Sequence, residues 1–173
     1  MRQAKKLWAI GYGLLMLAGC TQQPQQVRHL HERQEPDSAM MAQLNFNMQM
    51  ASEADKMCSA WIQNDTATYA LDDFGFWYTK TINSSTSPLQ IGEEATIHLQ
   101  IAELNGQVLA DIKEIITIGT SDLPVAINRS LKQLGRGEQM RIVAPWYTAY
   151  GTEGTTRIKP YTNLVITLTI SNE

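Results

Sequence analysis

The feature that most constrains the fold is a pair of strand-like segments on either side of Asn105-Gly106. Residues 95–103 carry apolar side chains at every second position, and residues 107–118 return as a segment of similar length. Alternation with a period of two predicts a strand with one buried face. Asn-Gly between two such segments is the strongest short signal for a hairpin. The sequence therefore predicts an antiparallel sheet in the second half of the chain.

The segments that follow predict one short helix and two further strands. A helix fits residues 123–134, with Asp122 as its N-cap and Pro124 in its first turn. Apolar residues then alternate in residues 140–144 and again in residues 164–170. This order of elements predicts an α+β domain, in which a curved antiparallel sheet wraps around one helix.

Ahead of this domain, residues 37–64 predict an amphipathic helix, with Asp37 or Ser38 as its cap. Its apolar residues recur at helical spacing: Met40, Met41, Leu44, Met48, Ala51, Met57, Cys58, Trp61 and Ile62. This face packs on the chain's own domain, or it forms a homodimer contact through residues 38–63, or it is a Met-rich surface for unfolded clients. In each case Cys58 is interpreted as a packed small apolar side chain.

The first residues have the layout of a signal peptide. Three basic residues precede an apolar run over residues 7–18, which is too short to cross a bilayer as a helix. The run ends in Leu-Ala-Gly-Cys, which resembles the lipobox of bacterial lipoproteins. The resemblance implies that residues 1–19 are removed and that Cys20 is acylated, so that the chain is anchored to a lipid membrane.

Residues 20–36 are rich in Gln and charge and have little to bury, so we expect a flexible tether. No acidic export signal follows Cys20, and we therefore expect the domain on the periplasmic side of the outer membrane.

Charge and metal-ligand content exclude other classes of function. The chain has 14 Lys and Arg against 17 Asp and Glu, and the segment to be removed carries only basic charges, so nucleic acid is not an expected partner. His29 and His31 lie in the polar leader, and His98 stands alone in a strand. We expect no metal site and no cofactor.

Residues 131–151, LKQLGRGEQMRIVAPWYTAYG, resemble the segment of FKBP-type peptidyl-prolyl isomerases that runs from the end of the helix to Ala-Tyr-Gly. Ile158, Pro160 and the final LVITLTI resemble the closing loop and last strand of that family. The resemblance covers residues 75–173 and implies a half-barrel sheet folded over a short helix. Gly-Phe-Trp-Tyr at residues 75–78, after a lipobox, is similar to FKBP-like lipoproteins of the Bacteroidetes, including those associated with gliding motility.

The resemblance implies a pocket between sheet and helix that binds X-Pro segments of unfolded or exported proteins. Tyr150 matches the family tyrosine that hydrogen-bonds a carbonyl of the bound peptide, so it is the candidate catalytic residue. Pro124 stands where a backbone N–H would bind the ligand, and a proline has none. The residues matched to the lining of the proline pocket are Leu99, Leu109, Leu123, Pro124, Ile127, Ile158 and Ile166.

This lining departs from the family pattern because aliphatic residues replace aromatic ones. Ile127 stands in place of a tryptophan, Leu99 of a tyrosine and Ile166 of a phenylalanine. Ala110 falls where the family has an acidic residue. Asp111 would replace that residue only if a bulge shifted the register, because alternation puts it on the opposite face.

Two functions from different classes follow, with a third that needs no pocket. The first is a membrane-anchored FKBP-like isomerase and folding factor for exported proteins, with weakened activity. The second is a catalytically inactive FKBP-like chaperone or assembly module of an envelope complex. The third is a purely structural lipoprotein, in which the chain's own side chains fill the cleft.

Overall fold

The computed structural model describes residues 37–82 and 86–172, which belong to one compact unit, Pro36–Glu173. The proposed signal peptide, the lipidation site Cys20 and the tether lie outside the described residues. In the described part, no helix combines the length and the hydropathy that a membrane crossing requires.

The predicted helices and strands follow one another in the expected order, with further elements between them. The elements are α1 (Ser38–Gln63), β1 (Ala70–Leu71), β2 (Trp77–Ile82), β3 (Glu94–Glu103), β4 (Val108–Thr117), α2 (Val125–Leu131), β5 (Gln139–Ala144), the 3-10 helix η1 (Trp146–Thr148) and β6 (Leu164–Ile170). Neither β1 nor η1 was predicted, because two or three residues carry no periodicity.

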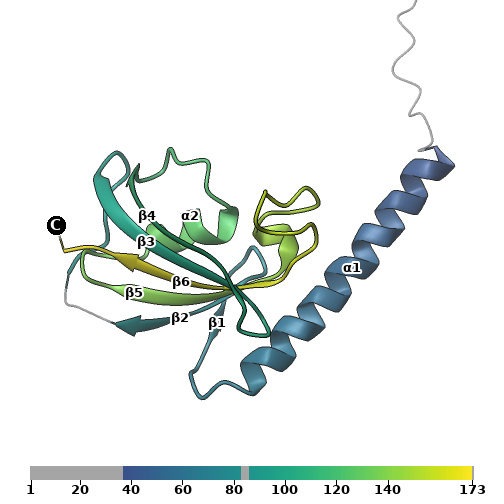
Figure 1. Cartoon of the computed structure of the whole chain (residues 1–173), viewed down its shortest axis with the longest axis horizontal. Coiled ribbons are helices and arrows are strands. Elements are labelled where there is room, and N and C mark those ends of the chain that lie inside the picture. The colour runs from purple at the N-terminus through teal and green to yellow at the C-terminus, as the bar shows by residue number, and fades with distance from the viewer. Residues whose placement is uncertain (1–36, 83–85, 173) are drawn as a thin grey trace, which may run out of the picture. The chain divides into compact units, whose positions relative to one another are not determined.

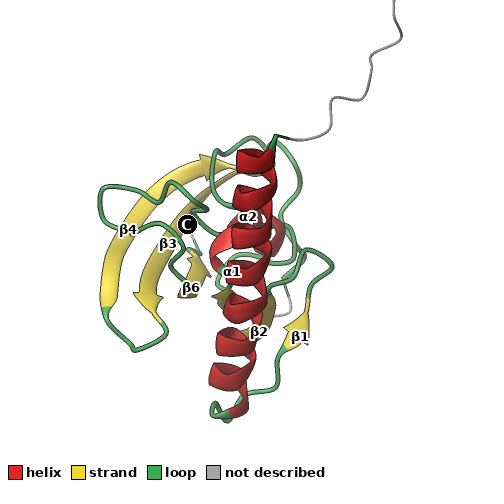
Figure 2. Ribbon diagram, turned by 90° about the vertical axis from the view of Figure 1, so that its right-hand side faces the viewer, coloured by secondary structure: helices red, strands yellow, loops and turns green. Residues whose placement is uncertain are grey.

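The strands form one antiparallel sheet in the order β1-β2-β5-β6-β3-β4. The sheet curves around α2 (Figures 1 and 2). The predicted α+β architecture and its N-terminal helix are thus confirmed. The core lies between the inner face of the sheet and α2, where alternate residues of β3, β5 and β6 meet the side chains of α2.

The start of α2 differs from the prediction. The helix begins at Val125, one residue after Pro124, and Asp122 makes no capping hydrogen bond to it. Pro124 has an extended ψ of 153°, so the chain enters the helix only after it. The side-chain amide of Asn128 instead donates to the carbonyl oxygens of Ser121 and Leu123, which holds the entering segment against the first turn.

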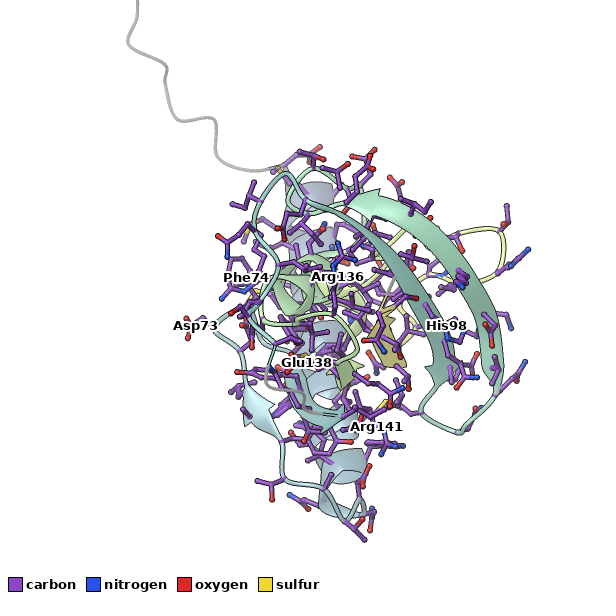
Figure 3. The ribbon with its side chains drawn as sticks, turned by 90° about the vertical axis from the view of Figure 1, so that its left-hand side faces the viewer. Asp73, Phe74, His98, Arg136, Glu138 and Arg141 are labelled. Carbon is purple, nitrogen blue, oxygen red and sulfur yellow. The ribbon has the colours of Figure 1, made fainter. Side chains whose placement is uncertain are left out.

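The turn between β1 and β2 is held against α2 by a charged pair. Asp72 is buried, and its carboxylate accepts from the guanidinium of Arg129 at 2.9 Å and from the backbone N–H of Phe74 at 3.0 Å. The same guanidinium lies over the ring of Phe74, 4.4 Å from its centroid. Figure 3 shows Phe74 beside α2 and Asp73 pointing outward.

The two halves of α1 have different surroundings. Asp37 caps the helix by accepting from the N–H of Ala39 at 3.4 Å. In the C-terminal half Ala54 and Cys58 are buried, because this half packs against β5 and η1. Packing on the chain's own domain is therefore the correct interpretation for this half. In the N-terminal half the large apolar side chains are exposed: Met40, Met41, Leu44, Phe46 and Met48.

The connection from α1 into the sheet is fixed by Asp65. Its carboxylate accepts from the N–H of Ala67, from the hydroxyl of Tyr69 at 2.8 Å and from the guanidinium of Arg141 on β5 at 2.9 Å. These donors lower the pKa of Asp65, with the Ala67 hydrogen bond as the largest cause. The ionised carboxylate therefore joins α1, the approach to β1 and the centre of the sheet.

Candidate functional site: a pocket at Tyr150

A cavity of about 360 Å³ opens beside Tyr150, where the segment after η1 faces the segment before α2. Its lining residues are Asp122, Pro124, Ala149, Tyr150, Gly151, Thr152 and Glu153. The turn is set by backbone hydrogen bonds, in which the N–H groups of Ala149 and Gly151 both donate to the carbonyl of Trp146. Gly151 has a φ of 68°, a conformation that favours glycine. The Ala-Tyr-Gly segment thus places the tyrosine at the cavity.

Tyr150 is half-buried and packs against the core, and no described residue is hydrogen-bonded to its hydroxyl. Burial raises the pKa of Tyr150, and the carboxylate of Glu114 raises it further. The hydroxyl therefore stays protonated at neutral pH and can donate a hydrogen bond to a carbonyl oxygen in the cavity.

Of the residues predicted to line a proline pocket, Pro124 joins Tyr150 at this cavity. Leu109 and Leu123 are half-buried and pack on the core. The four others lie within the core itself, with exposed fractions of 3% or less: Leu99, Ile127, Ile158 and Ile166. These four are the predicted floor of the proline pocket, and none of them is among the residues that line the open cavity. Contact between this floor and a proline ring stays a prediction.

Pro124 supplies no N–H donor at the cavity, because its nitrogen is part of the ring. The carbonyl of the preceding Leu123 is occupied by the side-chain amide of Asn128. A bound peptide therefore meets an apolar ring on this side. The hydroxyl groups that can donate a hydrogen bond belong to Tyr150 and Thr152 on the opposite side, whereas the side chain of Asp122 on this side is a carboxyl group.

Asp111 faces away from the cavity. The register between β3 and β4 does shift, with Ile101 opposite Ala110 and Ala102 opposite Val108, which leaves Leu109 as the extra residue. Asp111 nevertheless lies on the outer face, where it is exposed and paired with Nε2 of His98 at 2.6 Å. This hydrogen bond lowers the pKa of Asp111. The bulge does not turn its carboxylate toward Tyr150.

Three carboxylates near Tyr150 were not anticipated from the sequence. Asp122 and Glu153 line the cavity, and Glu114 is close enough to raise the pKa of Tyr150. Glu114 lies on the same face of β4 as Ala110 and Ile112, four and two residues earlier in the alternation. That alternation is the sequence signal that could have placed Glu114 on the inner face of the strand. Asp122 and Glu153 lie in loops, whose positions periodicity does not predict.

A second and larger cavity, of about 640 Å³, lies between α1, the β3–β4 hairpin and the loop before β6. It shares no residue with the cavity at Tyr150. In the described part of the chain, no three His, Cys, Asp or Glu side chains are grouped so that they could hold a metal ion.

The architecture has clear counterparts among solved structures. FkpA of Escherichia coli superposes with a TM-score of 0.61 at 14% sequence identity, over 78% of this chain and 64% of that one. The fold is FKBP-like. A peptidyl-prolyl cis-trans isomerase of Pseudomonas syringae pv. tomato superposes with a TM-score of 0.56 at 17% identity, over 70% of this chain and 93% of that one. The N-terminal domain of FKBP42 of Arabidopsis thaliana superposes with a TM-score of 0.55 at 14% sequence identity, over 62% of this chain and 92% of that one.

At these identities the likeness concerns the FKBP-like fold alone. The chain spans less than two thirds of the length of the FkpA structure. No family model matches the sequence, and no curated protein matches it significantly. The activity therefore has to be argued from the cavity and its residues.

Proposed function

We propose that this protein is a membrane-anchored FKBP-like peptidyl-prolyl cis-trans isomerase, a folding factor for exported proteins with weak activity. The observation that carries the proposal is the Tyr150 hydroxyl, which lies at a cavity on the FKBP-like fold and has no hydrogen-bond partner among the described residues. Its substrates are X-Pro segments of unfolded or exported proteins.

Isomerisation of this kind requires no acid, base or nucleophile. The X-Pro amide rotates over a barrier of about 18–20 kcal/mol. A site lowers this barrier by binding the twisted amide better than either planar isomer. Here the Tyr150 hydroxyl would donate to a peptide carbonyl, while Pro124 and the apolar residues beneath the rim would hold the proline ring. The rotation would then occur in a site whose polar groups are already oriented.

Two features support a rate below that of a site with a complete set of contacts. Pro124 removes one backbone donor. Ile127, which lies within the core, offers the proline ring no aromatic surface. Each contact made only with the twisted amide contributes to the rate, so its loss slows the reaction.

The anchor and the location are part of the proposal. Acylation of Cys20 would hold the domain on the periplasmic side of the outer membrane, as a lipoprotein similar to the FKBP-like lipoproteins of the Bacteroidetes. Incorporation of labelled palmitate into the full chain, and its loss in Cys20→Ser, would test this. Label retained by Cys20→Ser would contradict it.

A homodimer through residues 38–63 is also proposed. The exposed apolar residues of the N-terminal half of α1, Met41 and Met48 among them, support it. Sedimentation of the fragment 36–173 should show a dimer that Met48→Glu dissociates and that the exposed-site control Gln49→Glu leaves intact. A monomer at all concentrations would contradict it.

The second candidate function is an FKBP-like chaperone or assembly module without catalysis. The burial of Ile127 and Leu99 favours it, because the floor is closed into the core.

A protease-free isomerisation assay on a short X-Pro peptide separates the two candidates. The wild-type protein should exceed the uncatalysed rate, and Tyr150→Phe should lose about ten-fold or more of the excess. A wild-type rate equal to the uncatalysed rate would leave the chaperone function as the one to pursue.

A further inference from the structure

The larger cavity is a groove with α1 as one wall and the FKBP-like domain as the other. From α1 come Met50, Ala54, Met57, Ala60 and Trp61, and from the domain come Leu104, Trp146 and Tyr161. Met57 is 56% exposed, so part of the apolar wall is open to solvent. The volume of about 640 Å³ lies within the range of ligand sites.

The aromatic walls are held in place by hydrogen bonds at their polar atoms. The indole N–H of Trp61 donates to the carbonyl of Leu104 at 2.9 Å, and that of Trp146 donates to the carbonyl of Met50 at 3.3 Å. The hydroxyl of Tyr161 donates to the side-chain oxygen of Asn47 at 3.0 Å. With these atoms satisfied, the ring faces present apolar surface in a fixed geometry, which lowers the entropy lost when a ligand binds.

Tyr161 adds a sign of local strain at the groove. It is the non-glycine residue of the described chain with a positive φ, 58°. Its ring packs edge-on against Trp146, with 4.8 Å between the centroids. Backbone strain of this kind persists where the surrounding structure fixes a side chain, and such positions cluster at ligand sites.

The charged residues that line the groove are all acidic. Glu53 on α1 and Glu103 at the end of β3 are its charged lining residues, and no Lys or Arg is among the residues that line it. An occupant therefore has to be apolar at its centre and is favoured if it carries a positive charge at its edge.

We propose that this groove is a second polypeptide-binding site, for a segment in which a large apolar side chain is flanked by Lys or Arg. The apolar side chain would lie between Trp146 and Met57, and the cation would lie near Glu53 or Glu103. Recognition does not require proline, and this site goes beyond the proposed isomerase function because it shares no residue with the cavity at Tyr150.

A second copy of the chain fits the groove less well than a client segment does. The apolar half of α1 that is exposed for such a contact, residues 38–50, reads SAMMAQLNFNMQM and has no Lys or Arg. It would fill the groove without a cationic partner for either glutamate. A basic, apolar segment of another protein supplies both the apolar side chain and the cation.

The test measures the anisotropy of a fluorescent, proline-free peptide with a central Phe-Leu-Lys sequence, titrated with the full chain and with the fragment 36–173. Ala60→Phe should raise the dissociation constant about ten-fold or more, because the exposed Ala60 lines the groove and a phenyl ring would occupy it. Ala42→Phe, an exposed position on α1 that is not part of the groove lining, is the matched control and should bind normally. Met57→Ala, which shortens one wall, should weaken binding less.

A charge series completes the test. Exchange of the peptide's Lys for Gln, or Glu53→Gln with Glu103→Gln in the protein, should each weaken binding about two- to five-fold, and the two changes together should do no more than either alone. Binding that survives Ala60→Phe, or that is equal for Lys, Gln and Glu peptides, would overturn the proposal. So would a dimer that Ala60→Phe dissociates, because the occupant would then be a second copy. Loss of isomerase activity in Tyr150→Phe with peptide binding unchanged would separate this site from the proposed function.

Discussion

The cavity at Tyr150 and the groove beside Trp146 differ in how their apolar parts are exposed. At the cavity, four of the seven residues matched to the proline pocket lie in the core, and of the seven Pro124 alone lines the open volume. In the groove, aromatic and methionine side chains line the open volume itself. Side chains that complete a core are already in contact with their neighbours. Side chains between two elements that meet over only part of their length leave space.

The comparison also shows how each site is supported. The cavity is set by one tight turn after η1 and by the entry to α2, which are close in the fold. The groove depends on the C-terminal half of α1 staying docked through Trp61, Trp146 and Tyr147, whose hydroxyl donates to Asp55. A change that undocks α1 should therefore disrupt the groove and leave the cavity at Tyr150 unaffected.

The largest effect is expected at Cys58, which reports on whether α1 stays docked. Burial, with a smaller contribution from the Asp55 carboxylate, raises the pKa of Cys58 to about 12. The thiolate is the reactive form, so alkylation at pH 8 should be about a hundred-fold or more slower in the folded protein than in urea. Trapping with iodoacetamide, followed by mass spectrometry, measures the two rates. Similar rates would mean that α1 detaches readily.

The next effect concerns the predicted floor of the proline pocket. Ile127→Ala should lower the free energy of unfolding by about 3 kcal/mol, because Ile127 is fully buried and its truncation leaves a hole in the core. Leu123→Ala, at a half-buried neighbour, should cost about 1 kcal/mol. Urea unfolding measures both. A cost for Ile127→Ala below that for Leu123→Ala would mean that the floor is open to solvent.

A smaller, pH-dependent effect is expected at Asp65, which ties the end of α1 to the sheet. Its pKa is lowered in the folded state, so its contribution to stability is present above the unfolded pKa of about 4 and is lost as the pH falls through the folded value. Asp65→Asn should therefore lower stability by about 1 kcal/mol at pH 7 and by less below pH of about 4. The exposed Asp73→Asn is the control. A cost for Asp65→Asn that does not change with pH would contradict the ionic role.

The smallest effect is expected for the stability of Tyr150→Phe. Because no described residue is hydrogen-bonded to its hydroxyl, the loss should stay within about 0.5 kcal/mol. Tyr69→Phe, which loses the hydrogen bond to Asp65, should cost about 1 kcal/mol. Thermal unfolding compares the two. A large loss for Tyr150→Phe would assign its hydroxyl a structural role in place of ligand binding.

Much of the sheet could be predicted because its residues alternate. The Asn105-Gly106 hairpin, β5 and β6 each have one face that must be buried, and the period of two records which residues face inward. The same rule correctly keeps Asp111 on the outer face and would have placed Glu114 inward. The capping of α2 was wrong, because Pro124 fits either the first helical turn or the residue before it, and Asn128 decides between them through contacts across the turn.

What the sequence by itself determined is the pattern of buried faces, and with it an FKBP-like fold that carries Tyr150 in its Ala-Tyr-Gly setting. Only the tertiary structure decided which apolar residues are packed and which stay open. Met57 and Cys58 are neighbours on α1 with similar apolar character, yet one is 56% exposed beside the groove and the other is fully buried. Helical periodicity predicts that a face is apolar, but burial depends on whether another part of the chain reaches it, and that is set by distance in the folded molecule.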